Sequence, residues 1–188
     1  MLFIALASST MQHFAMVILI PFICTYDHAL IKSYEIGILL AAAMAGELIA
    51  SRFTEPSISK LGTKWSLQLG FLAMVTSSFG FWGVTHLGND SDFMTLGFLA
   101  RFVYGLGVGL LRSVIIIARA QSKKGKKELQ ARDYFKWHMQ GEALGYFIGP
   151  LLILLTFHNR GENETACLYL AIAQALVWFV FTLLFYDR

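Results

Sequence analysis

Charged residues are scarce in this sequence of 188 residues. They account for 14% of the chain, whereas a soluble domain usually carries about 25%. Hydrophobic residues account for 56%, and the mean hydropathy is +0.60. Because so little charge is available to face water, the composition argues against a soluble domain and favours a lipid bilayer as the main solvent.

Cysteine is nearly absent, and so are the motifs of catalysis. Cys24 and Cys167 are too few for a disulfide framework and do not have the spacing of metal ligands. The sequence contains no zinc-ligand cluster, no phosphate-binding glycine loop and no Ser-His-Asp arrangement. We therefore expect no enzymatic activity, no metal site and no cofactor.

Six long apolar runs dominate the chain. A hydrocarbon core about 30 Å thick needs roughly 20 apolar residues in a helix, and a helix satisfies its own backbone hydrogen bonds in lipid. The runs fall at about residues 2–24, 36–53, 65–84, 93–118, 134–157 and 166–186. The sequence therefore predicts an all-α membrane protein, folded as a single bundle of six transmembrane helices.

Lysine and arginine gather in two of the connections between these runs. Short loops rich in basic residues favour the cytoplasmic side of a membrane. Ten basic residues lie in or beside the second-to-third and fourth-to-fifth connections, and the other three hold only Lys32 and Arg160. This asymmetry predicts that both ends of the chain are cytoplasmic. The ten residues are Arg52, Lys60, Lys64, Arg119, Lys123, Lys124, Lys126, Lys127, Arg132 and Lys136.

The placement of the basic residues also bears on partners. They lie between apolar runs instead of forming a stripe on one surface, so we expect no nucleic acid partner. At the membrane surface they would contact membrane lipids. Two N-glycosylation sequons, at Asn89 and Asn163, fall in connections assigned to the opposite, lumenal face, which makes these asparagines candidate glycosylation sites.

Four ionisable residues stand out within the apolar runs, where charge is costly and indicates function. They are Glu47, Arg101, Arg112 and Glu142. Arg112 and Glu142 lie at similar depth, roughly 9 Å from the cytoplasmic ends of their helices, so they could pair. The pair could be a gate or proton-linked switch, or a structural ion pair. Glu47 could be a proton or cation site, or a protonated carboxyl bonded to another helix.

Glycine and proline form a pattern in the fifth run. Gly145 and Gly149 are four residues apart, and Pro150 follows them. Small residues at this spacing let helix backbones approach closely, and a proline bends the helix beyond them. The pattern predicts a compact bundle with a bent fifth helix.

Two segments resemble helix motifs of the major facilitator superfamily. Arg101 followed by Gly105, Gly107 and Gly109 resembles the motif of its fourth helix. Residues 145–150 resemble the antiporter motif of its fifth helix. The resemblance implies that Arg101 belongs to a proton-linked or gating network and that residues 145–150 form a helix bend.

The second connection resembles the cytoplasmic loop motif of the same superfamily. Lys60, Gly62 and Lys64 match it, whereas Ser59 stands where an aspartate is usual. The resemblance implies that this loop helps to lock the outward-facing state. The nearest branch is the vesicular amine and drug:proton antiporters, whose first helix carries an aspartate where this chain has Gln12. Gln12 would face the central cavity.

The resemblance covers the whole chain and implies a fold and a function. The fold would be the six-helix N-terminal half of a longer carrier, built from two three-helix repeats. The function would be alternating-access transport of a small organic solute coupled to protons, around a site near the bilayer midplane. The second half would come from the same chain or from a dimer. The expected location is the plasma membrane or an endolysosomal or vesicular membrane.

A second function of a different class fits the same residues. Six spans are half of such a carrier, and Gln12 and Ser59 depart from its motifs. These departures favour a non-transporting relative that serves as a structural or assembly subunit of a larger membrane complex. Solute uptake distinguishes the two functions, because only a carrier shows it.

Overall fold

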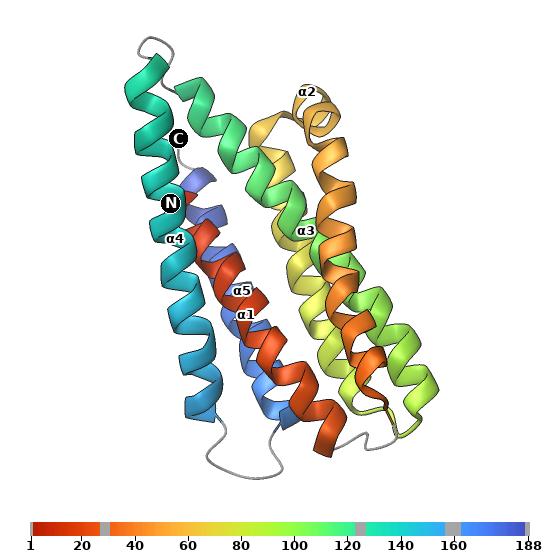
Figure 1. Ribbon diagram of the computed structural model, residues 1–188. Coiled ribbons are helices and arrows are strands. Elements are labelled where there is room, and N and C mark those ends of the chain that lie inside the picture. The colour runs from red at the N-terminus through yellow and green to blue at the C-terminus, as the bar shows by residue number, and fades with distance from the viewer. Residues whose placement is uncertain (1, 27–30, 123–126, 157–162, 187–188) are drawn as a thin grey trace.

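The computed structural model describes residues 2–26, 31–122, 127–156 and 163–186, which form five helices and no strand. The prediction of an all-α fold is therefore confirmed. Two helices, α2 and the part of α3 from Asp90 to Ile117, are long and apolar enough to cross a membrane. The helices are α1 (Leu2–Tyr26), α2 (Ser33–Thr85), α3 (Asp90–Ser122), α4 (Lys127–Thr156) and α5 (Asn163–Tyr186) (Figure 1).

Helix α2 consists of two segments joined by a bend at Gly62. This glycine has φ 79° and ψ 165°. Residues with a Cβ atom rarely adopt this backbone conformation. The first segment (residues 33–61) and the second (residues 63–85) then run in roughly opposite directions (Figure 1). The sequence placed a longer connection between residues 53 and 65. In the structure the helix continues past the end of this apolar run, as far as the bend.

Side chains fix the beginnings of two helices. The Glu35 carboxylate accepts a hydrogen bond from the backbone N–H of Lys32, at 2.7 Å, at the start of α2. The Asn89 side-chain oxygen accepts one from the backbone N–H of Ser91, at 3.1 Å, at the start of α3. Both oxygens satisfy N–H groups that have no partner within the helix.

Glycines place α3 against both segments of α2. Gly105 and Gly109 face the first segment, and a Cβ atom at Gly109 would lie 2.5 Å from the carbonyl oxygen of Glu47. Gly107 faces the second segment, where a Cβ atom would lie 2.7 Å from the carbonyl oxygen of Gly70. Real Cβ atoms do not approach so closely, so the three backbones pack only because these positions lack side chains.

Helix α4 packs on α1 in the same way. A Cβ atom at Gly145 would lie 2.6 Å from the Cβ of Thr10, and one at Gly149 would collide with the carbonyl oxygen of Met11. The structure thus has the close approach that the spacing of these glycines suggests. Helix α4 continues through Pro150 as far as Thr156.

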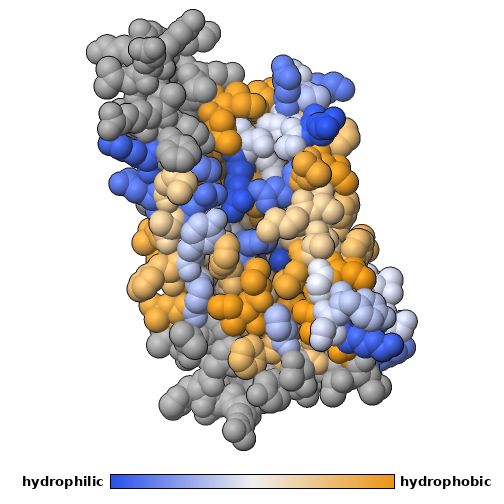
Figure 2. All heavy atoms as spheres, viewed as in Figure 1, coloured by the Kyte–Doolittle hydropathy of each residue, from blue (hydrophilic) through white to orange (hydrophobic). Residues whose placement is uncertain are grey.

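Large apolar side chains cover much of the outside of the bundle. Leu48 is 70% exposed, Trp65 66% and Phe147 71%. Figure 2 shows hydrophobic residues across the flanks of one face and hydrophilic residues near its ends and in its middle. Exposed apolar area on this scale marks a surface that contacts lipid or another protein.

We predict that Gly105→Ala destabilises the protein. The new Cβ atom would collide with the carbonyl oxygen of Ala43, and overpacking of this kind costs roughly 1–3 kcal/mol. Thermal unfolding of the purified protein in detergent measures the loss. Gly80→Ala is the matched control, because a Cβ atom there has nothing within 4 Å. An equal loss of stability in both variants would contradict the packing argument.

Candidate functional site

Two apolar clusters fill the interior of the bundle. One cluster includes the part of α1 from Ala15 to Cys24, together with Phe81 of α2 and Ala100 of α3. The other includes Leu6 of α1 and the buried apolar residues of α3 from Tyr104 onward. Each of these helices therefore passes from one cluster to the other.

A layer of buried polar side chains lies between the two clusters. Along α1, α3, α5 and the second segment of α2, polar residues occur where the helix leaves one cluster and enters the other. We call these residues the polar layer, and each is at most 6% exposed. They are Ser9, Thr10, Gln12, His13, Ser77, Ser78, Arg101 and Gln174.

Hydrogen bonds join the polar layer across helices. The Gln12 side-chain nitrogen on α1 donates to the hydroxyl of Ser78 on α2. The neighbouring Ser77 hydroxyl donates to the carbonyl oxygen of Ala100 on α3. Because buried polar groups are costly when they lack partners, these bonds stabilise the layer and hold α1, α2 and α3 in register.

Arg101 is the exception in this layer. Its side chain is 1% exposed, and its Nε and Nη2 atoms have no hydrogen-bond partner in the described part of the chain. The guanidinium carbon lies 5.0 Å from the centre of the Tyr104 ring, a cation–π contact. The Gln12 side-chain oxygen is likewise buried without a partner among the described residues.

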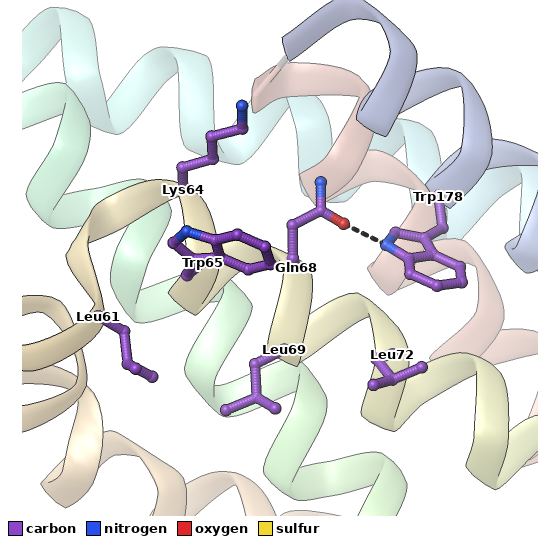
Figure 3. Close-up of a pocket in the computed structure, with 7 residues that line it drawn as sticks. All are labelled: Leu61, Lys64, Trp65, Gln68, Leu69, Leu72 and Trp178. Atoms are coloured by element: carbon purple, nitrogen blue, oxygen red, sulfur yellow. Dashed lines mark hydrogen bonds between the residues drawn. The ribbon is translucent and has the colours of Figure 1, made fainter. Parts of the chain in front are cut away.

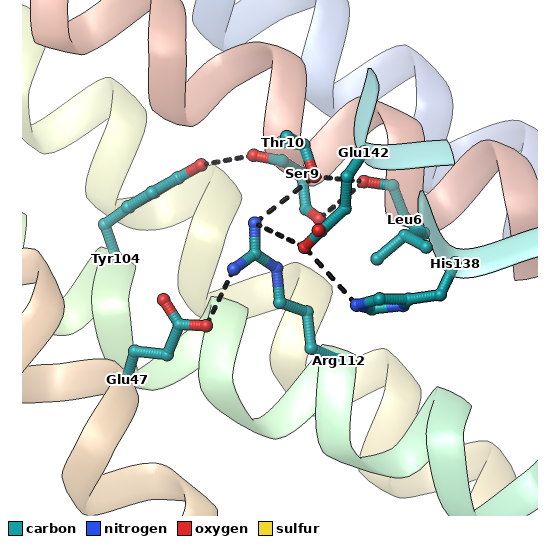
Figure 4. Close-up of polar contacts among 8 residues, drawn as sticks. All are labelled: Leu6, Ser9, Thr10, Glu47, Tyr104, Arg112, His138 and Glu142. Atoms are coloured by element: carbon teal, nitrogen blue, oxygen red, sulfur yellow. Dashed lines mark hydrogen bonds and ion pairs between the residues drawn. The ribbon is translucent and has the colours of Figure 1, made fainter. Parts of the chain in front are cut away.

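Arg112 forms a second polar site, on one side of the polar layer. Its guanidinium contacts three side chains from three other helices (Figure 4). Its Nη1 atom lies 2.8 Å from Glu47 Oε1 on α2, and its Nη2 atom lies 4.0 Å from Glu142 Oε1 on α4. Nη2 also donates to the Thr10 hydroxyl on α1 at 3.2 Å. His138 completes the group, with its Nε2 atom 3.4 Å from Glu142 Oε1.

The Arg112 network joins α3 to α4, two helices whose backbones are not closely packed. Helix α3 packs on α2 and α4 packs on α1, whereas α3 and α4 are not close along their described residues. The side chains of Arg112 and Glu142 are 18% and 16% exposed, so the bridge is only partly buried.

The structure brings three sequence-predicted residues into the Arg112 network. Arg112 and Glu142 were expected to be able to pair, and Glu47 was expected to be a proton or cation site or a protonated carboxyl bonded to another helix. The structure shows that Arg112 contacts both carboxylates. Gln12 and Arg101 lie in the polar layer instead. The functional roles of all five residues remain predictions.

The residues of the cytoplasmic loop motif and Asn89 lie at the surface. Gly62 is the bend of α2, and Lys60 and Lys64 are exposed on either side of it. Asn89 is exposed and caps α3. Asn163 is the first residue of α5, and its side chain lies outside the described residues.

An apolar groove lies between α5 and the second segment of α2. Its volume is about 520 Å³, and the Trp178 indole N–H donates to the Gln68 side-chain oxygen across it (Figure 3). Its walls are almost entirely apolar, so it suits a hydrocarbon chain better than a polar solute. The lining residues are Leu61, Lys64, Trp65, Gln68, Leu69, Leu72 and Trp178.

Sequence reasoning missed three members of these sites, namely Tyr104, Thr10 and His138. Tyr104, whose hydroxyl donates to the carbonyl oxygen of Ser9 at 3.0 Å, links the polar layer to α1. Thr10 and His138 complete the Arg112 network. Hydroxyl groups are common in packed apolar helices, so single residues carry little signal. The signal available was the clustering of polar residues in the middle of the first apolar run.

Comparisons of the chain with protein-family models and with curated proteins found no match.

We predict that Glu47→Gln destabilises the protein more than Glu142→Gln. The Glu47 carboxylate is the closer partner of Arg112, at 2.8 Å against 4.0 Å. Loss of this charge-assisted bond at a partly exposed site should cost roughly 1 kcal/mol. Thermal unfolding in detergent compares the variants, with Glu55→Gln, an exposed residue on α2, as the control. The prediction fails if Glu142→Gln or the control proves the more damaging change.

Proposed function

We propose that the chain is a multi-pass membrane protein and a six-helix half of an alternating-access carrier for a small organic solute. Five helices, one of them bent at Gly62, supply six helical segments, and α2 and α3 are long and apolar enough to span a bilayer. Shorter apolar stretches lie within α1 and α5. The exposed apolar outside and the buried polar layer also support a lipid environment.

The observation that carries the proposal is the shared guanidinium of Arg112. It bridges α3 to α4, which pack on different neighbours. A carrier needs contacts that can break and re-form while its helices move, and a partly hydrated ion pair meets that need. A purely structural subunit would gain more from close apolar packing at the same place.

Proton coupling follows from the residues around Arg112. Glu47 faces it from α2, Glu142 and His138 from α4, and Thr10 from α1. When Glu142 takes up a proton its charge is lost, and Arg112 keeps only the closer ion pair with Glu47. When the proton leaves, the attraction between α3 and α4 returns. Proton binding would thereby change how strongly the two helices are held together.

A second six-helix half would complete the carrier. It would come from the same polypeptide or from a second copy, and the solute would bind between the halves. The proposed orientation has both ends of the chain in the cytoplasm, in the plasma membrane or in an endolysosomal or vesicular membrane. The start of α1 and the end of α5 lie toward the same end of the bundle as the bend of α2 (Figure 1), in keeping with this orientation.

Transport by the full-length natural chain tests this proposal. We would reconstitute it in liposomes that enclose a pH-sensitive dye, impose a proton gradient and add carboxylates, organic cations, sugars and nucleosides in turn. At least one class should accelerate proton movement and accumulate in the vesicles. Arg112→Gln should slow this movement by about tenfold or more, since it removes the bridge.

Arg52→Gln is the matched control for this experiment, because Arg52 is an exposed arginine outside the network. It should transport at the rate of the unmodified protein. Should no class move protons or accumulate while the protein remains folded, the carrier proposal is wrong and the structural-subunit function replaces it. Equal loss of transport in both arginine variants would remove Arg112 from the mechanism.

A further inference from the structure

The buried charge of Arg101 has no counter-ion among the residues that the structure describes. Among the described residues, the carboxylates of Glu47 and Glu142 contact Arg112, and none contacts Arg101. The Tyr104 ring stabilises the cation only in part, because an aromatic face supplies no hydrogen-bond acceptor in the plane of the guanidinium. A buried guanidinium in this state would bind an anion with oxygen acceptors strongly.

Gln12 lies at the same level of the bundle as Arg101. Helices α1 and α3 run in opposite directions (Figure 1), and the hydrogen bond from Tyr104 to Ser9 joins them. Arg101 precedes Tyr104 by three residues, and Gln12 follows Ser9 by three. Because the helices are antiparallel, both positions lie about 4.5 Å from that bond in the same direction. Hydrogen bonds of the adjacent residues Ser78 and Ser77 also connect Gln12 to the backbone of Ala100, the residue before Arg101.

The two residues offer complementary atoms. Arg101 has unused N–H donors at Nε and Nη2, and Gln12 has an unused acceptor at its side-chain oxygen. The Gln12 side-chain nitrogen is already bonded to Ser78, which holds the amide in place. A ligand that satisfies both residues therefore needs anionic oxygen atoms and, beside them, a hydroxyl or N–H donor.

We propose that Arg101 and Gln12 bind a small organic anion that carries a hydrogen-bond donor next to its charge, such as a 2-hydroxycarboxylate. This inference rests on the proposed carrier function, and it names the class of solute. The anion would pair with the guanidinium, and the adjacent hydroxyl would donate to the Gln12 oxygen. Both side chains are buried in this structure, so the solute would enter when the helices separate.

Ligand-dependent thermal stability of the full-length chain in detergent tests the proposal. The probes are mandelate, phenylacetate, which lacks the hydroxyl, and mandelamide, which lacks the charge. Mandelate should raise the unfolding temperature most, phenylacetate less, and mandelamide not at all. Phenyl phosphate shows whether the site prefers a phosphate to a carboxylate as its anionic group. Equal shifts with mandelate and mandelamide would overturn the proposal.

Two substitutions locate the effect. Arg101→Gln should weaken apparent mandelate affinity by roughly tenfold to a hundredfold, because a charge-assisted pair is lost. Gln12→Glu places a carboxylate beside Arg101, so it should raise the stability of the ligand-free protein and abolish the response to mandelate. Arg52→Gln should leave the response unchanged. A full mandelate response in both site variants would exclude this site.

The result separates the solute class from the carrier function. If the reconstituted protein transports a cation or a neutral solute and does not respond to any of the anions, the anion site is wrong and the carrier function stands. If mandelate stabilises the protein through Arg101 and no solute is transported, the site stands and the carrier function is wrong.

Discussion

Helix α3 lies in its place because Gly105, Gly107 and Gly109 have no side chains. These glycines let its backbone contact both segments of α2, so the depth and rotation of α3 are set by van der Waals contact with two neighbours at once. The three polar residues that matter most, Arg101, Tyr104 and Arg112, are all on this helix. Their positions relative to α1, α2 and α4 are therefore a consequence of close backbone packing.

Burial of the polar layer costs folding free energy, which the two apolar clusters must offset. Most of its members recover part of that cost through hydrogen bonds, such as the bond from Gln12 to Ser78 and the bond from Ser77 to the backbone of Ala100. Arg101 does not recover it within the described residues. A buried charge whose donors lack partners is a feature of binding sites, because a ligand can supply the missing partner.

Sequence reasoning predicted the helices well and the contacts between them incompletely. Apolar runs indicated helical segments, but hydrophobicity shows how far a helix is apolar and not where the helix ends. The apolar runs therefore did not locate the bend of α2 at Gly62. Depth alone suggested that Arg112 and Glu142 could meet. It did not reveal Glu47 as the closer partner, because that contact depends on the rotation of α2 against α3. Hydroxyl groups such as that of Thr10 carried no separate signal.

The spacing of the two arginines explains how the proposed sites could act together. Arg101 and Arg112 are eleven residues apart, which is close to three helical turns, so both project from nearly the same face of α3 about 16 Å apart. Both sites also reach adjacent residues of α1: Tyr104, beside Arg101, bonds to Ser9, and Arg112 bonds to Thr10. Movement of α3 along α1 would alter both sites at once. Binding of an anion at Arg101 and of a proton at Glu142 would then both favour or both oppose this movement of α3. Such coupling between two sites is what a proton-linked carrier requires.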